Sequence, residues 1–384
     1  MKNLLYIFFA SLMATALRAQ DSSTAVKKLT VNGYIKDLQT LSFNNNFSEM
    51  VSGNVIHNRI NSKWKLSKRN AITAEFRNRL FWGEEVTRTP DFASLLRNEN
   101  EKVKLSKTWV NTSSLVVHTN VERLYFDYQT EERKVRIGRQ RINWGIATTW
   151  NPNDIFNVYD FLDFDYEERP GIDGATIKQL FKNSSSLELA YGQTAKSKGS
   201  IVAFKYALNK WNYDMQLIGG WYNDRFSFGS GWAGNINDAG FKGELQYFTG
   251  NRHTTGQLNL SLESDYMLKN GWYLSMGLLF NNNGSDKSIN DWNEINLIFS
   301  PTHLMPTKWS TILTTAKELT PLLSINVSTI YSPGTNLLIF FPSARYNMAT
   351  NLDINLSWQS FFSDLNNHFE PINHRCFLRI KWAF

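Results

Sequence analysis

The sequence alternates apolar and polar residues with a period of two, and this pattern is strongest at its carboxyl end. From residue 375 to residue 384, one phase is apolar and holds Cys376, Leu378, Ile380, Trp382 and Phe384. The other phase is mostly basic and holds Arg375, Phe377, Arg379 and Lys381. Because successive side chains of a β-strand point to opposite faces, the segment predicts a strand with one apolar and one charged face. At the edge of a soluble sheet, such a strand would promote aggregation.

The same alternation recurs along the chain, and each polar phase is too highly charged for a soluble core. Clear examples are residues 56–66, 72–82, 258–265 and 352–362. Aromatic residues make up 14% of the sequence, yet its mean hydropathy is −0.37. This combination is typical of a sheet that is apolar toward lipid and wet toward a lumen. We therefore expect the strands to close into a barrel around a water-filled lumen.

The spacing of turn residues separates short connections from long ones. Short turns are expected near Ser67–Asn70, Thr130–Arg133, Lys182–Ser185, Asn209–Trp211, Asn235–Ala239, Lys269–Gly271, Lys317–Pro321 and Ala349–Thr350. Long connections are expected at Gly83–Ser113, Gly145–Ile172, Gly284–Lys308 and Ser363–His374. Membrane barrels place short turns at one end and long loops at the other. The pattern predicts an all-β fold, a transmembrane antiparallel up-and-down β-barrel of about 18 strands, with 16 strands as the alternative.

The amino-terminal segment has the features of an export signal. Lys2 precedes an apolar run from Leu4 to Leu17, and the small residue Ala19 follows. The run is typical of a secretory signal peptide and shorter than the roughly 20 residues of a membrane-spanning helix. We therefore expect a signal peptide at residues 1–19 and a single barrel domain at residues 20–384. The net charge of +7 is spread over many strands, and export argues against nucleic acid as a partner.

Basic residues on the polar phases of several strands are candidates for the lining of a pore. The segment from Arg133 to Trp144 carries four arginines, and its apolar phase changes at Gly138. A β-bulge at this glycine would turn Arg139 or Arg141 inward. The predicted pore-lining basic residues are Arg77, Arg79, Arg123, Arg139 and Arg141.

The long connection at residues 145–172 is rich in acidic residues. The predicted constriction-loop acids are Asp160, Asp163, Asp165, Glu167 and Glu168. If the connection folds into the barrel, these carboxylates face the arginines and create a transverse field. The alternative interpretation is a solvated loop, with the arginines in contact with lipopolysaccharide or with one another.

Signatures of enzymes and cofactors are weak. The G-x-G-x-x-G match at residues 229–234 lies among strands, without the helix that holds a pyrophosphate. The sequence contains no HExxH, Cys-x-x-Cys or G-x-S-x-G motif. His368, Glu370 and His374 could ligate a metal ion, and the loop acids could hold calcium. We nevertheless predict no catalytic residues, no metal and no cofactor.

Two short motifs resemble known families. Arg-Ile-Gly-Arg-Gln-Arg at residues 136–141, with Trp144-Gly145 after it, resembles the Arg-x-Gly-Arg-Gln signature of Gram-negative, Bacteroidota-like porin-type barrels. The alginate-export family shares its Gly-Arg-Gln element. Residues 231–235 and 240–244 resemble a recurring element of porin-like proteins. The final strand, which ends in Phe384, resembles the signal that barrel-assembly machinery recognises for insertion.

These features together predict a porin of the bacterial outer membrane for passive diffusion of small polar, anionic solutes. The first alternative is an export channel for an anionic exopolysaccharide, and the second is a barrel that supports a surface enzyme or adhesin. The expected partners are outer-membrane lipid and lipopolysaccharide, the assembly machinery and small solutes. The oligomeric state is left open.

Overall fold

The computed structural model describes residues 28–45, 49–96, 102–158, 162–164, 169–194, 199–252, 254–288, 299–365 and 368–384. The predicted signal peptide lies outside these residues. Two short helices, α2 (Glu84–Arg88) and α3 (Phe92–Leu95), follow the third strand. The strands are β1 (Leu29–Phe43), β2 (Val51–Lys65), β3 (Asn70–Gly83), β4 (Ser106–Asn111), β5 (Leu115–Gln129), β6 (Arg133–Gln140), β7 (Ile172–Leu180), β8 (Ser186–Gln193), β9 (Ser200–Lys210), β10 (Tyr213–Tyr222), β11 (Arg225–Ile236), β12 (Ala239–Phe248), β13 (Gln257–Met267), β14 (Trp272–Asn281), β15 (Trp309–Thr320), β16 (Leu323–Ser332), β17 (Leu337–Ala349), β18 (Leu352–Leu365) and β19 (His368–Ala383).

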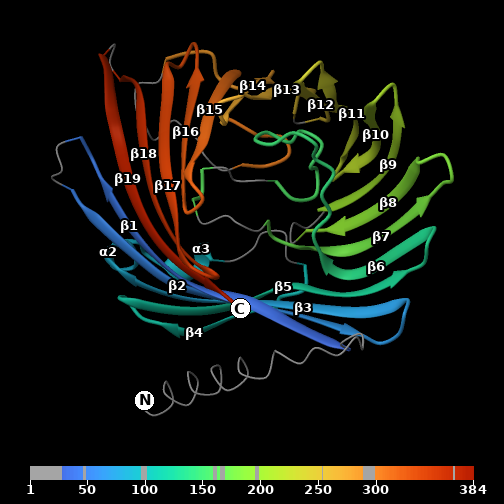
Figure 1. The fold of residues 1–384 in the computed structure, drawn as a ribbon, viewed down its shortest axis with the longest axis horizontal. Helices are drawn as coiled ribbons and strands as arrows, with labels where there is room; N and C mark the ends of the chain where they lie inside the picture. Colours follow the sequence, from blue (N-terminus) through green and yellow to red (C-terminus); the bar gives the residue numbers. More distant parts are fainter. Residues whose placement is uncertain are drawn as a thin grey trace.

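The strands form one closed antiparallel barrel. Nearly every strand pairs with its neighbour in the chain, and β1 pairs with β19 to close the ring, as the blue and red strands of Figure 1 show. The backbone groups of Gly33 and Phe384 exchange two hydrogen bonds of 3.0 and 2.9 Å at this closure. Of the 19 strands in the described residues, only β4 is not needed for the circuit. The barrel therefore has 18 strands, which confirms the prediction of 18 over the alternative of 16.

Strand β4 fills a gap in the wall that β6 leaves. Along one edge, β5 pairs with β3 over nearly its whole length. Along its other edge, β6 covers only residues 124–129, and β4 covers residues 116–120. The chain leaves the wall after Gln140 and returns to it at Ile172. The short strand thus supplies the pairing that β6 stops providing, which blunts an edge that would otherwise lie open.

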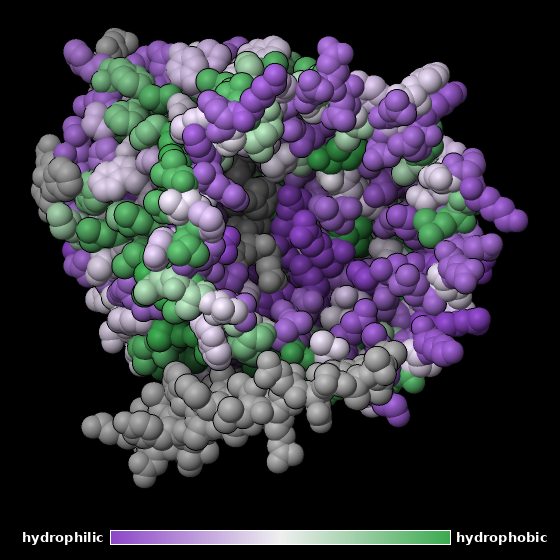
Figure 2. Space-filling view, in the orientation of Figure 1, coloured by the Kyte–Doolittle hydropathy of each residue, from purple (hydrophilic) through white to green (hydrophobic). Residues whose placement is uncertain are grey.

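The outer face of the barrel is apolar, and the inner face is polar. Outward side chains such as Ile137, Leu217 and Leu313 are more than half exposed to solvent. Inward polar residues such as Lys36 and Asn259 are almost fully buried. Figure 2 shows one face of the molecule hollowed, with hydrophilic residues gathered in the hollow. This distribution is that of a barrel whose outer surface contacts lipid. Among the described residues, no helix is long and apolar enough to cross a membrane.

The structure corrects one predicted connection. Residues 363–374 do not form a long loop, because β18 continues to Leu365 and β19 begins at His368. The register of these two strands shifts opposite Phe361 and Phe362, where Pro371 pairs. A bulge of this kind accommodates a proline, which cannot donate a backbone hydrogen bond to the ladder.

Candidate pore site

The segment that leaves the wall after β6 spans residues 141–171 and is called the pore loop here. Its described residues, 141–158, 162–164 and 169–171, lie inside the barrel. The strand that leads into it contains Gly138, whose φ of 123° is unfavourable for residues with a side chain. A Cβ at this position would also lie 2.3 Å from the carbonyl oxygen of Leu124. The predicted bulge at Gly138 is nevertheless wrong, because β5 and β6 stay in register across it. The bulge lies on β5, between the pairs Glu75–Arg123 and Phe76–Val121.

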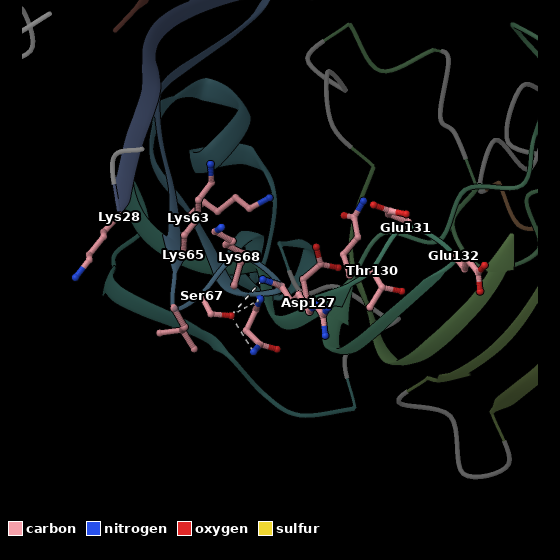
Figure 3. Close-up of a pocket in the computed structure, with 14 residues that line it drawn as sticks. Lys28, Lys63, Lys65, Ser67, Lys68, Asp127, Thr130, Glu131 and Glu132 are labelled. Carbon is pink, nitrogen blue, oxygen red and sulfur yellow. Dashed lines mark hydrogen bonds between the residues drawn. The ribbon is translucent and has the colours of Figure 1, made fainter. Parts of the chain in front are cut away.

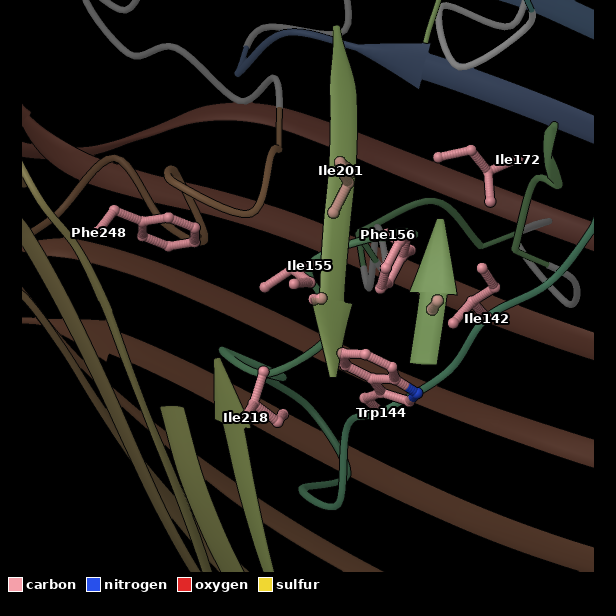
Figure 4. Close-up of a cluster of buried hydrophobic side chains, with 10 residues drawn as sticks. Ile142, Trp144, Ile155, Phe156, Ile172, Ile201, Ile218 and Phe248 are labelled. Carbon is pink, nitrogen blue, oxygen red and sulfur yellow. The ribbon is translucent and has the colours of Figure 1, made fainter. Parts of the chain in front are cut away.

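An apolar cluster anchors the first half of the pore loop to the wall. Trp144 is buried with its ring centroid 5.0 Å from that of Phe156, and its Nε1 donates to Glu188 at 3.1 Å. Membrane barrels carry a belt of aromatic residues at the lipid interface, and the burial of Trp144 excludes this residue from such a belt. Figure 4 shows the buried side chains of this cluster: Ile142, Trp144, Ile155, Phe156, Ile172, Ala190, Ile201, Ala203, Ile218 and Phe248.

Two buried carboxylates, one on β12 and one on β13, bind the tip of the pore loop. Glu244 on β12 accepts backbone hydrogen bonds from Ala147 at 2.6 Å, from Asn153 at 2.8 Å and from Ile146. Glu263 on β13 accepts them from residues 148 and 149 at 2.7 and 2.8 Å. A carboxylate that accepts several N–H groups is stabilised in its charged form. The backbone N–H groups of the loop therefore offset part of the cost of burying these two side chains.

Further contacts hold the second half of the pore loop. Arg169 forms an ion pair with Asp154, and burial raises the pKa of Asp154 to about 6, although the guanidinium opposes this shift. The side chain of Gln359 on β18 donates to the carbonyl of Leu162 at 2.9 Å. The ring of Phe164 stacks on Phe377 of β19 at 5.0 Å. The loop thus contacts walls on several sides of the barrel, and Figure 1 shows it within the ring of strands.

Arginines from neighbouring strands gather beside the pore loop around Glu122. Arg77 donates to Glu122 Oε1 from its Nε at 2.7 Å, and Arg123 donates to the Glu122 carbonyl at 2.7 Å. The β5 bulge makes this possible, because it turns both Glu122 and Arg123 inward. Arg59 forms an ion pair with Glu75 next to them. We call this group the arginine cluster, and its members are Arg59, Arg77, Arg79, Arg123 and Arg141.

The structure places the fifth predicted arginine, Arg139, in the wall instead of the cluster. Its guanidinium contacts Asp173 at 2.8 Å and donates to the carbonyls of Val121 and Val103. In the strand register it pairs with Leu124, whose side chain is exposed on the outer face. Arg139 therefore closes the seam at the end of β6. Of the predicted loop acids, Asp163 is described and lies near Glu85, whereas Asp160, Asp165, Glu167 and Glu168 lie outside the described residues.

Basic side chains continue from the arginine cluster to the end of the barrel with the short turns. Arg136 pairs with Asp127 at 3.2 Å. At the mouth, lysines on one side and acids on the other line a cavity of about 1120 Å³, as Figure 3 shows. The labelled residues are Lys28, Lys63, Lys65, Ser67, Lys68, Asp127, Thr130, Glu131 and Glu132.

The sequence predicts no metal or cofactor site, and the alternative near the end of the chain is a metal ion at His368, Glu370 and His374. His374 lies on β19 with its Nδ1 2.8 Å from the Oγ of Ser360, and His368 and Glu370 are exposed near the start of that strand. Within the described ranges, no group of three or more His, Cys, Asp or Glu side chains is arranged to hold a metal ion.

Comparison with known proteins identifies the fold. No protein-family model matches the sequence, and no curated protein matches it significantly. OccAB4 of Acinetobacter baumannii matches 94% of this chain and 99% of its own, with a TM-score of 0.58 and 8% identity. The outer membrane protein OprD of Pseudomonas aeruginosa matches over 94% of both chains, with a TM-score of 0.58 and 9% identity. OccK11 of the same organism matches 94% of this chain and 97% of its own, with a TM-score of 0.57 and 10% identity. The chain shares the barrel fold of these proteins.

Proposed function

We propose that the protein is an outer-membrane porin through which small polar, anionic solutes diffuse. The apolar outer face supports a position in a lipid bilayer, and the shared fold with the outer membrane protein OprD supports the outer membrane. The observation that carries the proposal is the arginine cluster, which lies where the pore loop narrows the lumen. A lumen lined by one sign of charge between low-dielectric walls concentrates counter-ions.

The crossing of the pore loop favours small solutes over a polymer. The loop is hydrogen-bonded to Glu244 and Glu263 on one wall and to Gln359 on another, so it divides the lumen. A polysaccharide chain would need these bonds to break. The export alternative therefore stays a prediction. A relationship to the alginate-export family or to Bacteroidota barrels likewise rests only on the motif at residues 136–141.

Three further roles belong to the same proposal. We propose that Asp163 and the predicted acids at residues 160, 165, 167 and 168 supply the negative charge that faces the arginines. Phe384 pairs with Gly33 in the closing strand and serves as the insertion signal for the assembly machinery. Exposed basic residues at the outer rim contact lipopolysaccharide.

Single-channel recording in planar bilayers tests the proposal. We expect stable pores that prefer chloride over potassium, and we expect a double variant, Arg77→Gln with Arg123→Gln, to lose most of that preference. The control is Arg133→Gln, which removes one positive charge from an exposed position paired with Gln179. A barrel without conductance, or a preference that the double variant keeps, would contradict the proposal.

A further inference from the structure

Five basic residues line the cavity at the end of the barrel with the short turns, and we call them the basic rim. They come from three neighbouring segments: the residue before β1, the end of β2 and the turn between β2 and β3. The members of the basic rim are Lys28, Lys63, Lys65, Lys68 and Arg69, and Figure 3 shows the four lysines on one side of the cavity. Membrane barrels place their short turns at the periplasmic end, so the basic rim faces the periplasm.

Backbone hydrogen bonds fix the positions of the basic rim. The N–H of Lys65 donates to the carbonyl of Lys28 at 2.7 Å, so these two residues lie side by side. The N–H of Gln129 on β5 donates to the carbonyl of Arg69 at 2.8 Å, which ties the turn to the next strand of the wall. Lys63 and Lys65 share the phase of β2 that points into the lumen. The sheet therefore holds the attachment points of these cations in place.

The protein does not neutralise the basic rim. Within the described part of the chain, none of its five side chains forms an ion pair, whereas Arg59 and Arg77 of the arginine cluster pair with Glu75 and Glu122. All five side chains of the basic rim are also exposed. These cations are therefore available to a ligand, and the buried arginines are engaged by their own wall.

The acids of the same cavity do not cancel this charge. Asp127 is already paired with Arg136 at 3.2 Å. Glu131 and Glu132 lie across the cavity from the lysines (Figure 3), and no ion pair among the described residues joins them to the basic rim. Two basic residues, Arg133 and Lys134, follow them directly in the chain. The cavity thus carries an excess of positive charge on the side of β2.

The chemistry of the basic rim suits a chain with several carboxylates. A lysine ammonium is a strongly hydrated point charge on a flexible stem, so it does not impose one binding geometry. An exposed ion pair contributes little by itself, and a ligand must engage several cations at once to bind measurably. Among the described residues that line the cavity, none is an aromatic residue on which a nucleobase could stack. The partner is therefore a flexible polyanion without bases.

Strand geometry favours an acidic peptide among such polyanions. Residues that lie two apart on one face of a strand are separated by about 7 Å, and this distance separates the attachment points of Lys63 and Lys65. An extended peptide has the same repeat, so its side chains at every second position match the two lysines in spacing. The exposed side-chain amide of Gln129 lies in the same cavity and can bond to a peptide group. A volume of about 1120 Å³ admits such a segment but not a folded domain.

We propose that the basic rim binds an extended acidic peptide segment of a periplasmic partner, with acidic residues at every second position. Two successive carboxylates of the segment reach Lys63 and Lys65, and a third reaches Lys28 or the turn. The bound segment docks the partner at the inner mouth of the channel and reduces ion flow while it stays there. The inference goes beyond the proposed function, because it does not depend on the solute that the channel passes.

Fluorescence anisotropy tests the binding without any need for permeation. The probe is a labelled peptide of three Glu-Ser repeats, added to the refolded barrel in uncharged detergent micelles. The competitors are the same peptide without label, a peptide of three Gln-Ser repeats and a uronic acid trisaccharide, which also carries three carboxylates. We expect no competition from the neutral peptide and at least threefold weaker competition from the trisaccharide. Affinity for the probe should fall from about 0.1 M to about 1 M salt, because the Debye length shortens from about 10 Å to about 3 Å.

A charge-matched pair of double variants assigns the site. Lys63→Gln with Lys65→Gln should weaken binding of the acidic peptide about fivefold, the effect of two exposed ion pairs. The control, Lys182→Gln with Lys210→Gln, removes the same charge from exposed positions at the same end but outside the cavity, and it should bind like the wild type. Equal losses in the two double variants, unchanged binding in both, or equal competition by the trisaccharide would overturn the inference.

Single-channel recording adds the expected sidedness. The acidic peptide should interrupt the current when it is added on the side of the short turns and not when it is added on the other side. Block from both sides would contradict a site at the periplasmic mouth. Chloride preference measured on the same channels tests the proposed porin function separately, because a barrel without this preference can still bind the peptide, and a selective barrel can fail to bind it.

Discussion

The two halves of the lumen are both polar, but they use polarity differently. The side formed by β1–β9 carries cations, and the arginine cluster pairs with Glu75 and Glu122 from the same wall. The side formed by β11–β18 is lined mainly by amides and hydroxyls, and these bind loops. Asn281 donates to the carbonyl of Met305 at 2.9 Å, and Gln359 donates to that of Leu162. Polarity alone therefore does not mark the path of a solute. One wall docks loops through its amides and hydroxyls, and the other presents charge and holds the pore loop mainly through apolar contacts.

Removal of a docking carboxylate should give the largest effect. Glu244→Ala leaves three backbone N–H groups of the pore loop without their acceptor, and each such bond to a charged group contributes roughly 1.5–3 kcal/mol. We expect the loop tip to detach and the single-channel conductance to rise at least twofold, with frequent closures. A variant that conducts like the wild type would show that the loop is held by other contacts. Ser357→Ala on the same half is the control.

Charge removal on the other half should change selectivity and not conductance. Arg123→Gln takes one cation from the arginine cluster and one hydrogen bond from the carbonyl of Arg169, but it leaves the contacts of the pore loop with β12 and β13 in place. We expect the chloride preference to fall severalfold at 0.1 M salt, and to fall less at 1 M salt, where the Debye length is about 3 Å. Reversal-potential measurements in asymmetric salt give the result. A drop in conductance without a change in selectivity would break the division between the two halves.

A single amide on the docking wall should have the smallest effect. Gln359→Ala removes one hydrogen bond to the pore loop, which contributes about 1 kcal/mol. We expect a melting temperature lower by a few degrees, followed by circular dichroism, with unchanged ion selectivity. An altered selectivity would mean that this half also acts on the permeating ion.

The sequence predicts the barrel and much of the arginine cluster because both depend on local alternation. Arg77 and Arg79 share the inward phase of β3, so their proximity follows from alternation, whereas Arg123 joins them beside Glu122 through the bulge on β5. The same rule would have included Arg59, which occupies the polar phase of β2. Arg139 could not be placed in this way, because it stands at the end of β6, where the chain leaves the ladder.

The docking of the pore loop could not be predicted, because it joins segments that are distant in the chain. Glu244 binds backbone groups that lie 91 to 98 residues before it. Nothing local distinguishes this carboxylate from one that lines a pore. The burial of Trp144 has the same origin, since its surroundings exist only after the loop has folded inward.

The seam at the end of β6 has a mechanical consequence. Elsewhere in the circuit, neighbouring strands are joined by a ladder of backbone hydrogen bonds, but here the guanidinium of Arg139 joins β5, β7 and the segment before β4 through Val121, Asp173 and Val103. A side chain can release and re-form such bonds without moving a strand out of register. The wall is therefore most compliant where the chain turns inward, so lateral pressure from the bilayer would be transmitted there to the root of the pore loop.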